Sequence, residues 1–192
     1  MKLNILLAGA AAALLASATA ASAATNLVQN GSFETGDFTG WSQFGNTGFT
    51  GVSGCFDLGC PTDGALLANF GPVGSTGGIT QNLGSISGFF DIFFDLSNDS
   101  GNFFSADFGG TNLITNVPTG GNTHYSFTHI AASGPTALTF TFRNDPAWYT
   151  LDNVSVASGA PEPAAWALML TGFFGAGSVL RANRRRTAVA AA

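Results

Sequence analysis

Positive charge is nearly absent between the two ends of this 192-residue chain. Of its six basic residues, only Arg143 lies within residues 24–160, and that segment contains no lysine. Ten acidic side chains against this one basic side chain give the segment a net charge of −9, although the whole chain carries only −5. A surface of this charge repels phosphate backbones, which excludes nucleic acids as partners and leaves cations as candidates.

Cysteine is also scarce. The two cysteines, Cys55 and Cys60, lie in the stretch GCFDLGCPTDG. Their spacing is wider than that of a C-x-x-C redox pair, and a metal site would require further soft ligands that are lacking here. In an oxidising compartment the pair predicts a local disulfide that closes a small loop. So short a loop contributes less than the roughly 3 kcal/mol expected for a loop of 15 residues.

The segment between the two ends has no helical periodicity, no internal repeat and no recognisable catalytic constellation. No serine stands in a G-x-S-x-G elbow, and the glycine-rich stretch GPVGSTGG lacks the lysine of a phosphate-binding loop. His124 and His129 would face opposite sides of one strand, so they cannot share a metal ion and are expected at the surface or in turns. Asp91 and Asp95 share a strand face, where we interpret them as solubilising side chains rather than a glycosidase pair. We therefore predict a protein that is not an enzyme, with a secreted hydrolase as an alternative.

The segment does contain a series of short apolar runs separated by Gly, Asn, Asp, Ser and Pro, as is typical of strands joined by tight turns. We expect strands at residues 41–44, 49–52, 65–70, 79–83, 89–96, 103–108, 112–117, 124–130, 137–143 and 148–156. Short, regularly spaced strands predict an all-β fold, a single antiparallel β-sandwich of the jelly-roll type. The predicted domain covers residues 24–158.

Two of these runs alternate between apolar and polar side chains. In ALTFTFRN one face consists of Leu138, Phe140 and Phe142. In FFDIFFDLSN the apolar face consists of Ile92, Phe94 and Leu96, and the opposite face carries Asp91 and Asp95. Such alternation predicts strands with one face on the core and the other face in water.

The N-terminal residues 1–23 form a predicted secretory signal peptide. Lys2 precedes a short apolar run, and Ala21-Ser22-Ala23 fits the small-residue site that signal peptidase cuts. The run is too short for a membrane anchor, so we expect a signal helix that is removed; a cut after Ala20 is an alternative. The protein is therefore predicted to be exported.

The C-terminus carries a second apolar segment. Residues 164–180 are 17 uncharged residues, which as a helix would span about 26 Å, at the short end of what a bilayer requires. The basic cluster that follows consists of Arg181, Arg184, Arg185 and Arg186. The positive-inside rule places this cluster and the tail, residues 187–192, in the cytoplasm. We expect a transmembrane helix that tethers the exported domain to the inner membrane.

Pro161, Glu162 and Pro163 stand just before this segment. The triplet, the apolar segment and the basic cluster resemble the PEP-CTERM sorting signal, to which we assign residues 159–186. The resemblance implies export in Gram-negative bacteria, cutting near the triplet by the membrane protease exosortase, and association with biofilm or exopolysaccharide at the cell surface or in the extracellular matrix. The triplet would then be a site on which exosortase acts and not a catalytic site of this chain. A plain tail anchor is the alternative.

The two ends of the central segment resemble those of carbohydrate-binding jelly rolls with a galactose-binding-like fold. The matching residues are Asn30, Gly31, Phe33, Glu34, Gly40, Trp41, Leu151, Asp152, Asn153 and Val154. In many such modules the first and last segments meet and share a structural calcium ion. The resemblance therefore implies that Glu34 and Asp152 supply carboxylate ligands to calcium. The alternative is that Glu34 takes part in a turn and Asp152 faces solvent.

Sugar binding would require an exposed aromatic platform, because flat rings stack on sugar faces. Trp41 occupies a framework position of the resemblance and is expected in the core, which leaves Trp148 and Tyr149. Neighbours on a strand point opposite ways, so one of these two can face outward. We predict a non-enzymatic surface or matrix protein with weak affinity for extracellular polysaccharide. An ice-binding or adhesion protein is an alternative, although Thr139-Phe140-Thr141 gives a single T-x-T step and no repeat.

Overall fold

The computed structural model describes residues 25–56, 59–98, 103–117, 120–159, 171–178 and 181. The strands are β1 Ser42–Gly45, β2 Thr50–Ser53, β3 Leu67–Phe70, β4 Gly77–Asn98, β5 Phe103–Phe108, β6 Thr111–Thr115, β7 Gly120–Arg143 and β8 Tyr149–Ser158. They pair in the order β2-β3-β8-β4-β7-β5-β6, with β1 paired to β4. Every pairing is antiparallel. The predicted all-β antiparallel fold is therefore confirmed.

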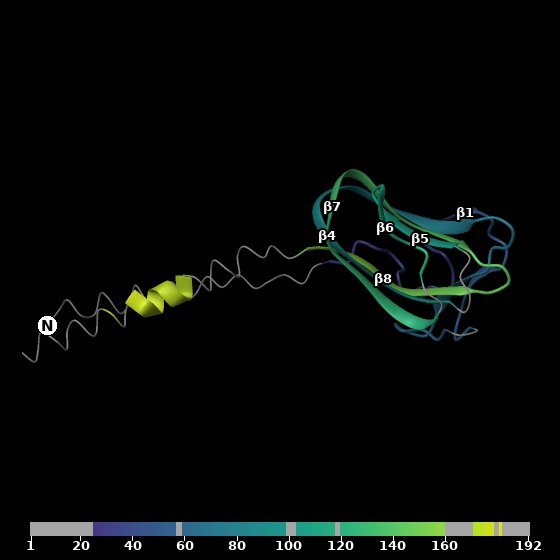
Figure 1. Ribbon diagram of the computed structural model, residues 1–192, viewed down its shortest axis with the longest axis horizontal. Coiled ribbons are helices and arrows are strands. Elements are labelled where there is room, and N and C mark those ends of the chain that lie inside the picture. Colours follow the sequence, from purple (N-terminus) through teal and green to yellow (C-terminus); the bar gives the residue numbers. More distant parts are fainter. Residues whose placement is uncertain are drawn as a thin grey trace, which may run out of the picture.

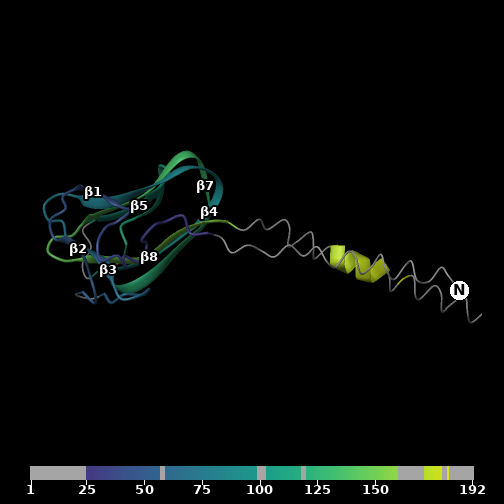
Figure 2. The same cartoon turned by 180° about the vertical axis from the view of Figure 1, so that it is seen from behind.

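The two longest strands, β4 and β7, belong to both layers of a sandwich. The first half of β4 lies between β1 and the second half of β7, which is followed by β5 and β6. The second half of β4 lies between β8 and the first half of β7, with β3 and β2 beyond β8. Figures 1 and 2 show β4 and β7 curving together at one end of the sandwich. One sheet thus folds over itself into two layers, which we call the β5 layer and the β8 layer.

This continuity corrects the expected strand count. Four predicted strands merge into two: residues 79–83 and 89–96 both belong to β4, and residues 124–130 and 137–143 both belong to β7. Gly84 and Gly88 interrupt the apolar pattern of β4 without ending the strand; their φ angles are +81° and +128°. The pairing with β7 also shifts in register between Asn82 and Ser85. Left-handed glycines and a bulge bend a strand while its pairing continues.

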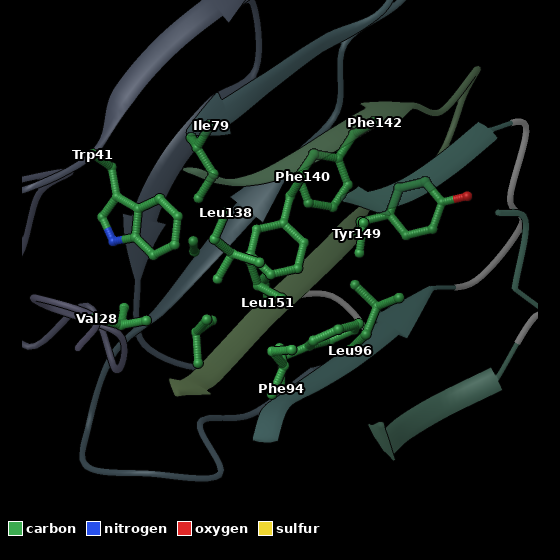
Figure 3. Close-up of a cluster of buried hydrophobic side chains, with 14 of the residues drawn as sticks. Val28, Trp41, Ile79, Phe94, Leu96, Leu138, Phe140, Phe142, Tyr149 and Leu151 are labelled. Carbon is green, nitrogen blue, oxygen red and sulfur yellow. The ribbon is translucent and has the colours of Figure 1, made fainter. Parts of the chain in front are cut away.

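Aromatic side chains from both layers meet in the core (Figure 3). Phe140 on β7 packs edge-to-face on Phe94 of the β8 layer, with ring centroids 5.1 Å apart. Phe142 stacks on Phe70 of β3 at 4.0 Å. Leu138, Phe140 and Phe142 are all fully buried, as their alternation predicts. Each buried ring contributes about 1.5–3 kcal/mol, so these contacts hold the two layers together.

Beyond the sandwich, residues 171–178 and 181 are helical. In the part of the chain that the structure describes, no helix is both long and apolar enough to cross a membrane. The signal peptide, the triplet Pro161–Glu162–Pro163, the cluster from Arg184 to Arg186, the tail and much of the 164–180 segment lie outside the described residues. The predictions made for them stay predictions.

Candidate functional site

The first and last segments of the sandwich meet, as the resemblance implies. The backbone N–H of Val154 donates to the carbonyl of Gly31 at 3.0 Å, and the N–H of Leu27 donates to Val156 at 2.7 Å. Gly31 lies so close that a Cβ there would be 2.0 Å from the carbonyl oxygen of Val154. Only glycine fits this approach, which explains why Gly31 is among the residues that match the carbohydrate-binding jelly rolls.

Other matching residues of the first segment close a turn and build the core. Trp41 is buried, stacks on Phe33 with centroids 6.0 Å apart, and donates from Nε1 to the carbonyl of Asn30 at 3.1 Å. The side-chain amide of Asn30 donates in turn to the carbonyls of Asp37 and Thr39 at 3.0 and 3.1 Å. The prediction that Trp41 is a core residue is confirmed, and it is not part of a ligand platform.

A loop crosses the outer face of the β8 layer. We call residues 54–66 the strap; its described parts are 54–56 and 59–66. Asn122 of β7 donates from Nδ2 to the carbonyl of Cys60 at 3.0 Å. Thr62 donates to carboxylates that project from β4 and β8. The strap therefore covers this face, and polar contacts hold it there.

Asp152 holds the middle of the strap. Its Oδ2 accepts hydrogen bonds from the backbone N–H groups of Thr62 at 2.7 Å and Asp63 at 2.9 Å, and contacts the Thr62 hydroxyl at 3.2 Å. Its Oδ1 accepts from the N–H of Asn153 at 2.7 Å. Asp152 is only 3% exposed, so the alternative in which it faces solvent is wrong.

Glu34 holds the next residues of the strap. Its Oε1 accepts from the N–H groups of Ala65 and Leu66, both at 2.7 Å. Ser32 adds a hydrogen bond from its hydroxyl to Asp63 at 2.8 Å. Unlike Asp152, Glu34 is exposed. The two acids marked by the resemblance thus bind neighbouring parts of one loop.

These contacts bear on the expected calcium ion. Carboxylate oxygens are the ligands calcium prefers, and it takes six to eight oxygens. In this structure Asp152 and Glu34 are engaged with backbone N–H donors. Among the described residues, no group of three or more His, Cys, Asp or Glu side chains is placed to hold a metal. The calcium prediction rests on the resemblance alone, and amide hydrogen bonds already link the same elements.

The expectation that Asp95 faces water is wrong. Asp95 is 8% exposed and lies across from Asp152 in the β4–β8 pairing. Its carboxylate accepts from the Thr62 hydroxyl at 2.6 Å and Asn153 Nδ2 at 3.0 Å, and lies 2.6 Å from Nδ1 of His124. The strap covers this face, which the alternation of the strand could not reveal. The His124 side chain remains 55% exposed, as expected of a surface residue.

The remaining acid and histidine of this region lie elsewhere. Asp91 is partly exposed, and its Oδ1 accepts from the backbone N–H of His129 at 2.9 Å. The His129 ring stacks on Phe89 with centroids 4.1 Å apart. Asp91 and Asp95 therefore contact different groups, and these contacts do not bring them together as a pair.

The two acids under the strap have pKa values shifted in opposite directions. Burial raises the pKa of Asp152 against the hydrogen bonds from Asp63, Thr62 and Asn153. Burial acts in the same direction on Asp95, but the hydrogen bonds from Thr62, Asn153 and His124 outweigh it and lower the pKa of Asp95. Asp95 therefore keeps its charge more readily than its neighbour across the strands.

Three aromatic side chains gather beside the strap. We call Phe49, Phe56 and Trp148 the aromatic cluster. Trp148 lies 4.7 Å from Phe56 and 6.0 Å from Phe49 between ring centroids, and both contacts are close to perpendicular. Trp148 is partly buried over Gly71, where a Cβ would lie 2.8 Å from the indole ring. Phe49 is 68% exposed, so this cluster presents an apolar ring to solvent.

The structure separates Trp148 from its neighbour Tyr149. Tyr149 is 1% exposed and packs with Phe104 and Phe142 in the core, at centroid distances of 5.8 and 5.5 Å (Figure 3). Burial also raises the pKa of its phenol. The predicted ligand-binding role of Tyr149 is therefore wrong, because Tyr149 at the start of β8 points into the core. Trp148 remains as the candidate ligand-binding residue.

The predicted disulfide between Cys55 and Cys60 is confirmed. Within it, Phe56 and Gly59 exchange two backbone hydrogen bonds, at 2.7 and 2.8 Å. The disulfide therefore closes a small hairpin at the start of the strap. Because Phe56 follows Cys55 directly, this hairpin fixes the backbone from which Phe56 contacts Trp148.

Comparison with solved structures identifies the fold. The chain is similar to the carbohydrate-binding module TmCBM61, solved in complex with β-1,4-galactotriose, with a TM-score of 0.59 and 18% identity over 70% of this chain and 99% of that one. It is similar to the enzymatically active domain of tailspike protein 4 from bacteriophage CBA120, with a TM-score of 0.54 and 16% identity; the match covers 69% of this chain but only 21% of the tailspike chain. A third match is the K3 cleaved adhesin domain of Lys-gingipain from Porphyromonas gingivalis, with a TM-score of 0.50 and 18% identity over 68% and 99% of the two chains.

At these identities the likeness establishes the fold: an all-β sandwich like that of a carbohydrate-binding module. No protein-family model matches the chain, and no curated protein matches it. A fold of this kind is compatible with many tasks, so function has to be argued from the surface.

Sequence reasoning missed two members of the aromatic cluster. Phe49 follows Gly48 in a turn, and Phe56 lies between the two cysteines, so neither belongs to an alternating strand. An aromatic residue in a turn or a disulfide loop has no core face to occupy. The sequence prediction instead placed Phe49 at the start of a strand, residues 49–52, whereas the structure begins β2 at Thr50.

Proposed function

We propose that the central domain is an exported, non-catalytic glycan-binding module. The sandwich fold that it shares with TmCBM61 supports this proposal. The Cys55–Cys60 disulfide supports an extracellular setting, because disulfides persist in oxidising compartments. The fold alone does not identify a ligand, so the kind of ligand has to be inferred from the residues at the surface.

The aromatic cluster is the observation on which the proposal depends. Sugar rings are polar at their edges but present apolar C–H faces, and these faces stack on aromatic rings. Phe49 is exposed and Trp148 is partly exposed beside it. Exposing a side chain as large and apolar as Phe49 to water is unfavourable, and a ligand that covered the ring would gain the free energy of its burial. A glycan chain lying on the cluster would cover it.

The two ends of the chain would deliver this module. In our proposal signal peptidase removes residues 1–23, the apolar segment 164–180 crosses the inner membrane, and exosortase cuts near Pro161, Glu162 and Pro163. The helical conformation of residues 171–178 supports a helix in that segment. The module would then reach the cell surface or extracellular matrix, where exopolysaccharide and biofilm supply glycans. Calcium at Glu34 and Asp152 is compatible with this role but not needed for it.

Glycan binding is tested with the full chain, purified in mild detergent, on an array of polysaccharides and oligosaccharides that includes β-1,4-galactan. We expect saturable binding to at least one glycan and no release of reducing ends from it during prolonged incubation. Binding to no glycan would remove the proposed function, and the appearance of reducing ends would favour a hydrolase.

Sorting is tested separately in the native host by mass spectrometry of the exported product. We expect a C-terminus near Pro161 for the wild type and an uncut, membrane-retained chain for Glu162→Ala. A wild-type chain that keeps residues 164–192 at the cell surface would contradict the exosortase part of the proposal and leave glycan binding untouched.

A further inference from the structure

We propose that the aromatic cluster is the ligand site and that its ligand is a neutral glycan, not an acidic polysaccharide. This inference rests on the proposed function and narrows it to one surface and one chemical class. It depends on three features: how Phe49 is held, how the three rings are arranged, and where the charges lie.

Phe49 is held in a conformation that a bulky residue avoids. Its φ is 56°, in the left-handed region, and its side chain is 68% exposed. A non-glycine residue is strained in this region, and such strain gathers at functional sites. Burial of its own ring does not offset the strain, because the ring points to water. A ligand contact would explain why an aromatic residue stands at this position.

Hydrogen bonds fix the turn that carries Phe49. The carbonyl of Phe49 accepts from the N–H of Gly71 at 2.9 Å. Asn46 accepts at Oδ1 from the N–H of Gly48 at 3.0 Å and donates from Nδ2 to the carbonyl of Val73 at 2.8 Å. The turn is thereby tied to the segment that packs under Trp148. A ring positioned in advance binds a ligand without a further cost of ordering.

The three rings form a corner and not a flat stack. Phe49 and Phe56 stand at 87° and 75° to the plane of Trp148. Phe49 and Phe56 come from neighbouring segments, the turn before β2 and the disulfide hairpin, and Trp148 comes from a distant one, the residue before β8. Such a corner offers an apolar face to one sugar ring and an edge contact to its neighbour, as a chain ligand requires.

The charges exclude an acidic ligand. Arg143 is the only lysine or arginine of residues 24–160. Its guanidinium is already paired with Asp145, at 2.9 Å from both Nη2 and Nε. Asp145 also accepts from the N–H of Gly74 at 2.9 Å, so the pair is anchored to the segment next to the cluster. A polysaccharide that carries carboxylates or sulfates would meet a strongly acidic domain without a basic side chain to receive it.

The test compares ligands that differ in charge, with the methyl group of the ester as the one other change. Polygalacturonate and its fully methyl-esterified form share a backbone, and further neutral and acidic polysaccharides from the array extend the comparison. Affinity electrophoresis and calorimetry on the full chain are expected to show tighter binding to neutral members, with affinity for them unchanged between low and high salt. Tighter binding to the acidic forms would overturn the assignment of ligand class.

The site is tested with Phe49→Ala and Trp148→Ala against a matched control. Phe89→Ala removes a ring that is also exposed, at 51%, from the other end of the domain, where the N–H of Gly159 meets the carbonyl of Phe89. Losing one stacked ring is expected to weaken binding about tenfold or more, and Phe89→Ala to change it less than about twofold. Because Phe49 is exposed, its variant should fold like the wild type, which the far-ultraviolet circular dichroism spectrum checks.

The outcomes distinguish the two proposals. If the wild type and Phe49→Ala bind neutral glycans equally well, the site lies elsewhere and the proposed function still stands. A wild type that binds no glycan removes the proposed function together with this inference. Retention of affinity in Phe49→Tyr, which keeps the ring, would support stacking as the source of the loss in Phe49→Ala.

Discussion

Replacing Asp152 by alanine is expected to release the strap. The substitution removes the acceptor of two backbone N–H groups, those of Thr62 and Asp63, at a position only 3% exposed. A donor left without a partner costs about 1–3 kcal/mol when it is buried, but Thr62 and Asp63 are exposed residues whose freed N–H groups water can reach in part, so we expect a loss of about 1–3 kcal/mol for the two together. That is a large share of the 5–15 kcal/mol that keeps a typical domain folded.

Urea unfolding of the full chain, followed by circular dichroism, measures this loss. Asp152→Ala should lower the midpoint without changing the slope, because the amount of surface exposed on unfolding stays the same. Asp152→Asn keeps one acceptor oxygen and should lose about half as much. Glu34→Gln serves as the exposed comparison, since water can replace its contacts with Ala65 and Leu66. Our reasoning fails if Asp152→Ala is as stable as the wild type or loses no more than Glu34→Gln.

Four further predictions follow from the same structure. The double variant Cys55→Ser/Cys60→Ser should lose about 2 kcal/mol in urea unfolding, because the closed loop is short, and no loss would contradict the entropic argument. Gly31→Ala should lower the free energy of unfolding by at least about 1–3 kcal/mol or prevent folding, since a Cβ would meet the Val154 carbonyl at 2.0 Å. A variant that melts at the wild-type temperature would contradict this prediction. Because the folded-state pKa of Asp152 is raised above 3.8, its contribution to stability is present at low pH and is lost as pH rises through that folded-state pKa. The stability of Asp152→Asn relative to the wild type should therefore increase as the pH rises from below 3.8 through that folded-state pKa, and a constant difference would refute this. Melting in the presence of EDTA should match melting without it if amide contacts alone hold the strap, whereas bound calcium at 100 times its dissociation constant would add about 2.7 kcal/mol.

The core of the fold could be predicted because its signal is local. Leu138, Phe140 and Phe142 alternate with polar residues, and the structure buries all three. The pairing of the first segment with the last came from a resemblance in pattern, and the Gly31–Val154 contact bears it out. Neither inference required knowledge of how distant strands are ordered in the sheet.

What the sequence could not provide was the long-range arrangement. The bend at Gly84 and Gly88 looks like a turn in the sequence, because glycine permits both a turn and a bent strand. Asp95 has the pattern of a water-facing residue, and only the strap that crosses it makes it buried. The aromatic cluster joins three segments that are separated in sequence by up to about a hundred residues, so no local pattern marks it.

The central claim is that a glycan binds against Trp148. Titration of the full chain with a neutral glycan that it binds, followed by tryptophan fluorescence, tests this directly, because Trp41 is buried in the core and Trp148 is partly exposed. We predict a saturable change in emission whose midpoint matches the calorimetric affinity and which is lost in Trp148→Phe but kept in Trp41→Phe and in Trp166→Phe, which removes the third tryptophan of the chain. A saturable change that survives in Trp148→Phe, or glycan binding with no change in emission at all, would contradict the account.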